Sequence, residues 1–200
     1  MNLATKRPVP FVLATLLSAA VLFGCGGPPA VEEPGDDGSE LPRWVRIVPV
    51  ESEGRSWFVG AVSMASSEEQ AIKEARLDAL SQISRSARER FASLMAKANA
   101  GSGVSLKPIE RFQLSDAGRE MYATRVEEAA VMEDAHVEPC IEGLETVCQT
   151  YVLLGVPVEA WDRELSETLQ KLRREEAEAG RQTGVEYLDW MLRHQERPSR

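Results

Sequence analysis

Hydrophobic positions recur at helical spacing along residues 66–99, with charged and polar residues between them. Ser66 and Glu69 open this stretch with the spacing of a capping box, in which side chains accept hydrogen bonds from free backbone N–H groups of the first turn. We therefore expect a long amphipathic helix here. Its apolar stripe includes small residues four apart that leave room for a sheet to approach closely: Ala71, Ala75 and Ala79.

Four apolar runs predict β-strands. Residues 45–50 and 56–63 flank a polar turn that contains Gly54, an order typical of a hairpin. Residues 131–141 and 149–158 form a second pair of runs. We expect all four strands in one antiparallel sheet.

Two further helices follow from the pattern. Residues 115–130 predict a helix capped at Ser115 or Asp116, whereas residues 108–114 are ambiguous between helix and loop. After Pro157, apolar residues at helical spacing predict a helix that ends near residue 180: Trp161, Leu165, Leu169 and Leu172.

The last stretch, residues 181–200, predicts a separate short helix, because Thr183 and Glu186 again have capping-box spacing. Its apolar stripe has the chemistry to dock on the domain, on a second copy or on a partner. The whole order is β-β-α-(α)-β-β-α plus this tail helix. It predicts an α+β fold, with a long helix and a C-terminal helix packed on an antiparallel sheet of about four strands.

The first 25 residues have the features of an export signal. Lys6 and Arg7 precede an apolar run over residues 9–23, and Gly24 stands directly before Cys25. This order resembles a bacterial lipoprotein signal, in which residues 1–24 are removed and Cys25 is acylated. The alternative is an uncleaved anchor helix. Three acyl chains on Cys25 would hold the protein stably on a membrane.

Residues 26–42 are rich in Gly, Pro and acidic residues and have almost no large apolar side chain. Such a stretch buries too little surface to fold, so we expect residues 25–42 to form a lipidated cysteine with a disordered tether. Gly26, in place of an aspartate, favours the outer membrane over the inner membrane. The folded domain is then expected over residues 43–180.

Charge limits the set of partners. The formal net charge is −9, and it becomes −11 when Lys6 and Arg7 leave with the signal. An acidic surface argues against nucleic-acid binding and against electrostatic attachment to anionic lipid. The acyl chains must therefore provide the membrane attachment.

The two remaining cysteines, Cys140 and Cys148, form an even pair in an oxidising compartment, where a disulfide across a hairpin is the expected outcome. The alternative is a metal site that also uses His136, but no fourth ligand is evident in the sequence. We expect no metal and no cofactor.

No catalytic constellation is visible in the sequence. His194 lies in a charged tail, and His136 lies in a predicted strand among acidic residues. There is no phosphate-binding glycine motif. The tryptophans have two interpretations, core packing or the lining of a glycan or peptide groove: Trp44, Trp57, Trp161 and Trp190.

Several short motifs together resemble the LPP20 lipoprotein family. They are Pro42–Val45, Phe58–Ala61, the alanine series at the start of the long helix, and Thr150–Leu154. The similarity covers about residues 41–175. The chain departs from the family in having Val62 where a second glycine is common after Gly60, in its Cys140/Cys148 pair and in its extra tail after Gly180. The resemblance implies a small α+β domain on a lipid anchor with a non-enzymatic, assembly-type role, and it transfers no catalytic residue.

These observations predict a non-catalytic outer-membrane lipoprotein that faces the periplasm. It is expected to self-associate or to scaffold a periplasmic assembly, of which a flagellar one is an example among LPP20 relatives. The alternative is a module that binds peptidoglycan or a small periplasmic ligand through exposed tryptophans.

Overall fold

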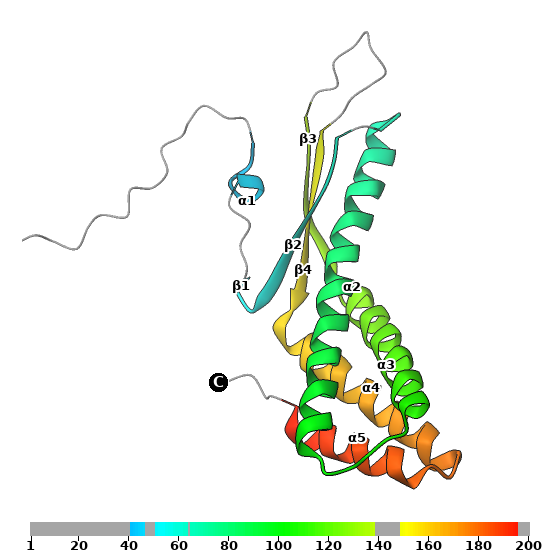
Figure 1. Cartoon of the computed structure of the whole chain (residues 1–200). Coiled ribbons are helices and arrows are strands. Elements are labelled where there is room, and N and C mark those ends of the chain that lie inside the picture. The colour runs from blue at the N-terminus through cyan, green and yellow to red at the C-terminus, as the bar shows by residue number, and fades with distance from the viewer. Residues whose placement is uncertain (1–40, 47–50, 64, 139–148, 196–200) are drawn as a thin grey trace, which may run out of the picture. The chain divides into compact units, whose positions relative to one another are not determined.

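The computed structural model describes residues 41–46, 51–63, 65–138 and 149–195 (Figure 1). It confirms the predicted α+β class, with one four-stranded antiparallel sheet and several helices. No helix among these residues is long and apolar enough to cross a membrane. The elements are, in chain order, α1 Arg43–Arg46, β1 Glu51–Ser52, β2 Arg55–Val62, α2 Glu68–Gly101, α3 Pro108–Glu128, β3 Val131–Val137, β4 Thr150–Pro157, α4 Val158–Glu178 and α5 Gln182–His194.

The sheet has the strand order β1-β2-β4-β3, so the long strands β2 and β4 lie at its centre. They pair along their whole length, from Arg55 opposite Pro157 to Val62 opposite Thr150. β3 pairs with the other side of β4, with an irregularity in register between Met132 and Asp134. The strands predicted over residues 56–63 and 149–158 are therefore confirmed.

The first hairpin differs from its prediction. Glu53 and Gly54 make the turn with positive φ angles of 55° and 71°, and β1 consists of two residues that the sequence assigned to that turn. The prediction of a strand over residues 45–50 was wrong for Val45 and Arg46, which lie in α1, and residues 47–50 lie outside the described residues.

α2 packs against β2 at the distance its alanines allow. Ala75 and Ala79 are completely buried, and a Cβ atom added to Gly60 of β2 would lie 1.9 Å from the Ala75 carbonyl oxygen. The predicted close approach is confirmed, since only a glycine opposite this alanine face lets the two backbones come so near. The predicted cap at Ser66 was wrong by one residue. Ser67 is the N-cap, and its Oγ accepts a hydrogen bond of 3.3 Å from the Gln70 N–H.

Side chains of α2 also satisfy backbone groups of β2. Asp78 Oδ2 accepts a hydrogen bond of 3.2 Å from the Ala61 N–H, and Gln82 Nε2 donates to the Val59 carbonyl oxygen at 2.9 Å. Gln82 Nε2 also lies 3.1 Å from Asp78 Oδ2. Unpaired backbone groups of a strand invite pairing with another chain, and these two side chains remove two such groups.

α3 begins earlier than the sequence indicated. It runs from Pro108, so the predicted start at Ser115 or Asp116 was wrong, and the ambiguous stretch before it is helical. Pro108 fits the first helical position because its missing N–H has no helical partner there. The carboxylate of Glu110 accepts a hydrogen bond of 3.1 Å from the Lys107 N–H.

α4 follows β4 directly, which confirms the prediction, and Gly180 with a φ of 70° ends this segment of the chain. α5 begins at Gln182 with Arg181 as N-cap and no side-chain cap bond, so the predicted capping box at Thr183 and Glu186 was wrong. The prediction left open what the tail helix docks on. α5 packs on α4 and α2 of its own chain.

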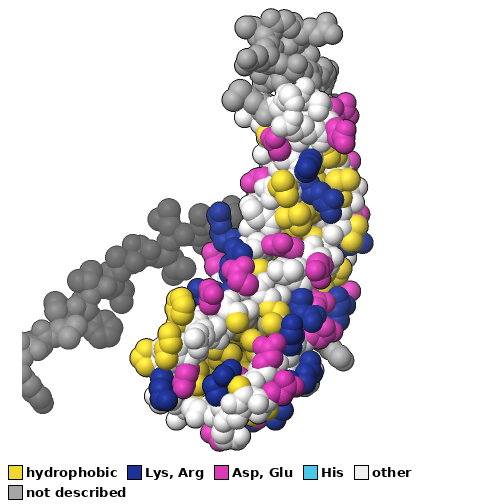
Figure 2. Space-filling model, turned by 90° about the vertical axis from the view of Figure 1, so that its right-hand side faces the viewer, with side chains coloured by type: hydrophobic (Ala, Val, Ile, Leu, Met, Phe, Trp, Pro, Cys, Tyr) yellow, Lys and Arg dark blue, Asp and Glu magenta, His cyan; other side chains and the backbone are white. Residues whose placement is uncertain are grey.

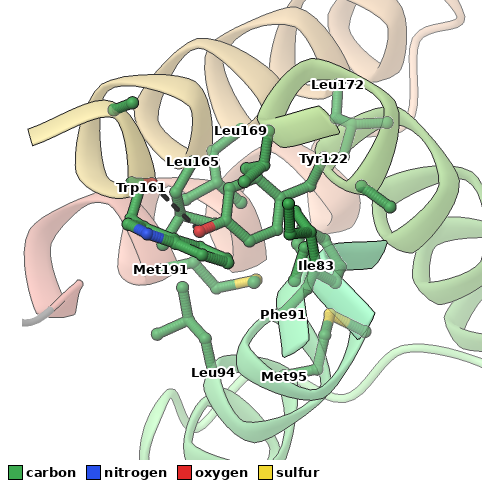
Figure 3. Packing of buried hydrophobic residues seen from close by; sticks show 14 of the residues in the cluster. Ile83, Phe91, Leu94, Met95, Tyr122, Trp161, Leu165, Leu169, Leu172 and Met191 are labelled. Atoms are coloured by element: carbon green, nitrogen blue, oxygen red, sulfur yellow. Dashed lines mark hydrogen bonds between the residues drawn. The ribbon is translucent and has the colours of Figure 1, made fainter. Parts of the chain in front are cut away.

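The hydrophobic core runs from the contact of β4 with the first half of α2 into the region where the second half of α2 meets α3, α4 and α5 (Figure 1, Figure 3). The hydroxyl oxygen of Tyr187 lies 2.8 Å from the Met95 carbonyl oxygen and 2.9 Å from Asn99 Oδ1, so its single hydrogen is shared between these two acceptors. Arg173 Nε of α4 donates to Asp189 Oδ1 of α5 at 2.5 Å, and both side chains are partly exposed. The fully buried large side chains include Ile83, Phe91, Tyr122, Leu154, Leu165, Leu169, Tyr187, Leu188 and Met191.

Candidate binding groove

The three cysteines for which the sequence predicts lipidation or a disulfide, Cys25, Cys140 and Cys148, lie outside the described residues. The alternative metal site formed by Cys140, Cys148 and His136 therefore includes two ligands that lie outside the described residues. His136 lies in β3 and stacks on Tyr151, with ring centroids 6.5 Å apart. His194 ends α5 and stacks on Trp190 at 4.0 Å. The two histidines belong to different parts of the fold and do not form one site.

Trp44 and Trp57 each donate a hydrogen bond to a nearby polar group. Trp44 Nε1 donates to Asp134 Oδ2 at 2.8 Å, and Trp57 Nε1 donates to Ser52 Oγ at 2.9 Å. Trp57 also carries the guanidinium of Arg55 over its ring, 5.8 Å from the centroid. These contacts fix the orientation of both indole rings.

Trp161 and Trp190 lie on the helices. Trp161 is 7% exposed and packs against Phe58 and Tyr122, with centroid distances of 6.1 and 6.5 Å. Trp190 is partly buried, and its ring lies against Gly101 of α2. The core-packing interpretation therefore holds for Trp161, although one side of this residue also lines a groove.

The groove has a volume of about 470 Å³ and lies where β1 and β2 meet the middle of α2 and the start of α4. Both Trp57 and Trp161 line it, so two of the tryptophans singled out in the sequence share one site. The lining combines aromatic rings with hydroxyl, carboxylate and guanidinium groups: Glu51, Ser56, Trp57, Phe58, Ser86, Arg90, Val158, Trp161 and Asp162.

An ion pair stands at the edge of this groove. The guanidinium of Arg90 donates to Asp162, and both side chains are partly buried. The hydroxyl of Tyr122 donates to the Trp161 carbonyl oxygen at 3.0 Å (Figure 3). Burial raises the pKa of Tyr122 well above its usual range, although the charge of Arg90 opposes this rise. The phenol therefore stays neutral, and Arg90 is held in place by Asp162.

Trp161 also contributes a buried donor. Its Nε1 has no hydrogen-bond partner among the described residues. Buried N–H groups are paired in the great majority of native structures, and an unpaired one costs about 1–3 kcal/mol.

A second, smaller cavity of about 170 Å³ shares Arg90 with the groove. It lies between α2, α4 and the end of α5. The described residues that line it include three basic side chains: Arg90, Ser93, Leu94, Lys97, Leu165, His194 and Gln195.

The described residues contain no group of three or more His, Cys, Asp and Glu side chains able to hold a metal ion. Acidic and basic side chains are interspersed on the face of the molecule in Figure 2, with hydrophobic side chains between them. The groove presents aromatic faces and hydrogen-bonding groups, and this arrangement is suited to binding.

Sequence reasoning missed Arg90, Asp162 and Ser86 as groove residues. Arg90 was one polar residue on a helix, and its partner Asp162 is 72 positions away. A signal was present in Asp162, which directly follows a tryptophan on the predicted apolar stripe, but only the packing of α2 against α4 brings the two charges together.

No protein-family model, curated protein or solved structure matches this chain.

Proposed function

We propose that this chain is a lipid-anchored, non-catalytic protein of the bacterial cell envelope that self-associates or scaffolds a periplasmic assembly. The observation that carries the proposal is the sequence Leu22–Cys25 after a basic and apolar leader, followed by the tether of residues 26–42. The resemblance to LPP20 lipoproteins supports the same role and the outer membrane as its place.

The fold changes which part of the chain is a candidate for assembly. The tail helix α5 buries Leu188 and Met191 in the core of its own domain, so its apolar stripe is not a spare docking surface. Large apolar side chains do remain exposed at the start of α3, where Ile109 and Phe112 are 60% and 68% exposed and lie one turn apart. This pair supports the assembly proposal, because neighbouring exposed apolar side chains mark interaction surfaces more often than single ones.

Light scattering after size-exclusion chromatography of residues 26–200, without lipid, tests the assembly proposal. We expect a mass above that of one chain, and Phe112→Ser is expected to shift it toward the monomer. Leu77→Ser is the matched control, since Leu77 is 56% exposed on α2. A strict monomer that retains no envelope partner would contradict the proposal. The tail helix must be kept in the protein because it belongs to the core.

A second candidate function is the binding of peptidoglycan or a small periplasmic ligand. The observation that favours it is the groove shared by Trp57 and Trp161. Titration with soluble cell-wall fragments, followed by tryptophan fluorescence, tests it. We expect a saturable change, and a flat response would contradict it.

A further inference from the structure

The sheet has one face packed against α2 and a second face turned away from it. A Cβ atom on Gly60 would meet the Ala75 backbone of α2, and the cross-strand partner of Gly60, Val152, is completely buried. Successive residues of a strand point to opposite faces, so Leu153 lies on the second face. Asp134 of β3 pairs with Leu153 and therefore lies there as well. We call this second face the open face.

α1 lies on the open face, on the side of the sheet opposite α2 (Figure 1). Trp44 Nε1 donates a hydrogen bond of 2.8 Å to Asp134 Oδ2. The other carboxylate oxygen of Asp134 accepts from the Ala135 N–H at 2.8 Å, and this second bond orients the group. Trp44 and Val45 are partly buried, whereas the two arginines of α1 are exposed. The apolar side of α1 is therefore turned toward the sheet.

Charge also favours this docking. α1 contains two arginines and no acidic residue, whereas β3 contains Glu133 and Asp134. A hydrogen bond to an ionised carboxylate is stronger than one between neutral groups. The bond joins residues 90 positions apart, so it holds the segment that follows the predicted tether on a distant strand.

α1 is nevertheless separable from the rest of the domain. None of its four residues is buried, and none belongs to the hydrophobic core. Its hydrogen bond to Asp134 is exposed, and β3 pairs with β4 without any contribution from α1. Segments with few buried apolar contacts and exposed hydrogen bonds open locally at a low free energy. α1 can therefore detach while the sheet and the core stay intact.

Detachment changes the length of free chain between the predicted anchor and the domain. Trp44 is 19 residues after Cys25, whereas Glu51, the first residue of β1, is 26 residues after it. At about 3.3–3.6 Å per residue, these stretches span at most about 65 Å and about 90 Å. Release of α1 therefore adds about 25 Å to the reach of the tether.

We propose that α1 is a latch that sets the reach of the lipid tether. With Trp44 on Asp134, the domain is held on the shorter tether. After release, the domain stands on the longer one and the open face beside Asp134 is uncovered. The latch goes beyond the proposed function, and its link to the membrane rests on the lipidation of Cys25 proposed above.

Limited trypsin cleavage of residues 26–200 tests the latch without the anchor. Cleavage after Arg46 tracks the population of the detached state when trypsin is slow relative to reattachment, so we expect Trp44→Phe and Asp134→Ala each to cleave at least threefold faster than the wild type. Asp116→Ala is the matched control, because it removes an exposed carboxylate of α3 and should cleave at the wild-type rate. Equal rates for all four proteins would overturn the latch.

Thermal unfolding of the same proteins tests whether α1 is separable. Trp44→Phe leaves β3 unchanged, so we expect the wild-type midpoint in this variant although its cleavage after Arg46 is faster. Asp134→Ala also removes the acceptor of the Ala135 N–H, so its midpoint alone does not decide the question. A midpoint that falls in Trp44→Phe would show that α1 is a structural part of the domain and would overturn the latch.

Energy transfer to a lipid dye tests the reach of the tether. The acylated protein carries a donor dye on Glu89→Cys, at an exposed position of α2, in vesicles of phosphatidylethanolamine and phosphatidylglycerol. We expect Trp44→Phe to lose energy transfer relative to the wild type, and Asp116→Ala to keep it. Unchanged transfer in Trp44→Phe would overturn the role of α1 in reach. An intact mass without acyl groups would contradict the proposed anchor, and the cleavage rates alone would then decide the latch.

Discussion

The two halves of α2 pack in different ways. The first half meets the sheet through small residues, with Ala75 and Ala79 directly against Gly60, so that backbone lies on backbone. The second half meets α3, α4 and α5 through large side chains such as Phe91 and Met95. Contacts between backbones tolerate almost no change, whereas contacts between side chains allow some repacking.

The groove lies at the change from one mode to the other. Ser86 and Arg90 line it, and they follow the alanine face and precede the contacts of the second half. Small residues let the sheet lie close to the first half of α2. Large residues keep α3, α4 and α5 farther from its second half. Between these two regions α2 leaves a space beside α4, and Trp161 of α4 lines that space.

Gly60→Ala should cause the largest loss of stability, because the added Cβ would meet the Ala75 carbonyl oxygen at 1.9 Å and the Ala79 nitrogen at 2.5 Å. Neither backbone atom can rotate away, so we expect a loss of about 3 kcal/mol or more in the free energy of unfolding. Urea denaturation measures it. Ala61→Ser, at an exposed neighbouring position, should stay within about 0.5 kcal/mol of the wild type. Equal effects of the two changes would contradict the backbone contact.

Gly118→Ala makes the matching test for the second half of α2, because Gly118 of α3 lies against Phe91 of α2. Here the added Cβ would lie 2.0 Å from Cζ of Phe91, which is a side-chain atom. We expect a loss of about 1–3 kcal/mol. Phe91→Leu should recover part of it, so that the double variant is more stable than the sum of the single changes predicts. Strict additivity in a double-mutant cycle would show that the two residues do not compete for space.

Tyr187→Phe removes the hydrogen bonds to Met95 and Asn99, and it should cost about 1–1.5 kcal/mol at neutral pH. Burial raises the pKa of Tyr187 to about 12. An unfolded tyrosine ionises near pH 10, so the contribution of this phenol to stability is complete below about pH 10 and is lost as the pH rises toward 12. Urea denaturation between pH 9 and 12 should therefore give a shallower decline in the variant than in the wild type, and an equal slope would contradict this origin.

Ser67→Ala should have the smallest effect of the four, about 1 kcal/mol, because Ser67 caps the start of α2 through the Gln70 N–H. Ser66→Ala is the control that separates the observed cap from the predicted one. Thermal unfolding followed by circular dichroism compares them. A larger loss of stability for Ser66→Ala than for Ser67→Ala would contradict Ser67 as the N-cap and support Ser66, the residue that the sequence indicated.

Local signals explain how much of the fold could be predicted. The alanine series four apart, the capping serines within one residue and the apolar runs of β2 and β4 are contained in short stretches, and their elements were confirmed. The start of α3 was missed because Pro108 was not recognised as a first helical residue. The docking of α5 depends on Tyr187 reaching Met95 in a helix 92 residues earlier, and no local pattern carries that distance.

The candidate groove shows the same division. Trp57 and Trp161 were singled out because their residue type is informative by itself. Arg90 and Asp162 were not singled out in the sequence, since a charge acquires a special role only from what packs beside it. The groove between β2, α2 and α4 forms only when these elements pack together, so the sequence of any one element does not predict it.

The lipid anchor is tested most directly by the intact mass of the protein extracted from bacterial membranes. We predict a chain of residues 25–200 that carries a diacylglyceryl group and a third acyl chain on Cys25, and that is lighter by two hydrogens for a disulfide between Cys140 and Cys148. Cys25→Ser should yield an unlipidated protein that keeps residues 1–24. A wild-type mass equal to that of the complete chain, or to residues 25–200 without acyl groups, would contradict the anchor.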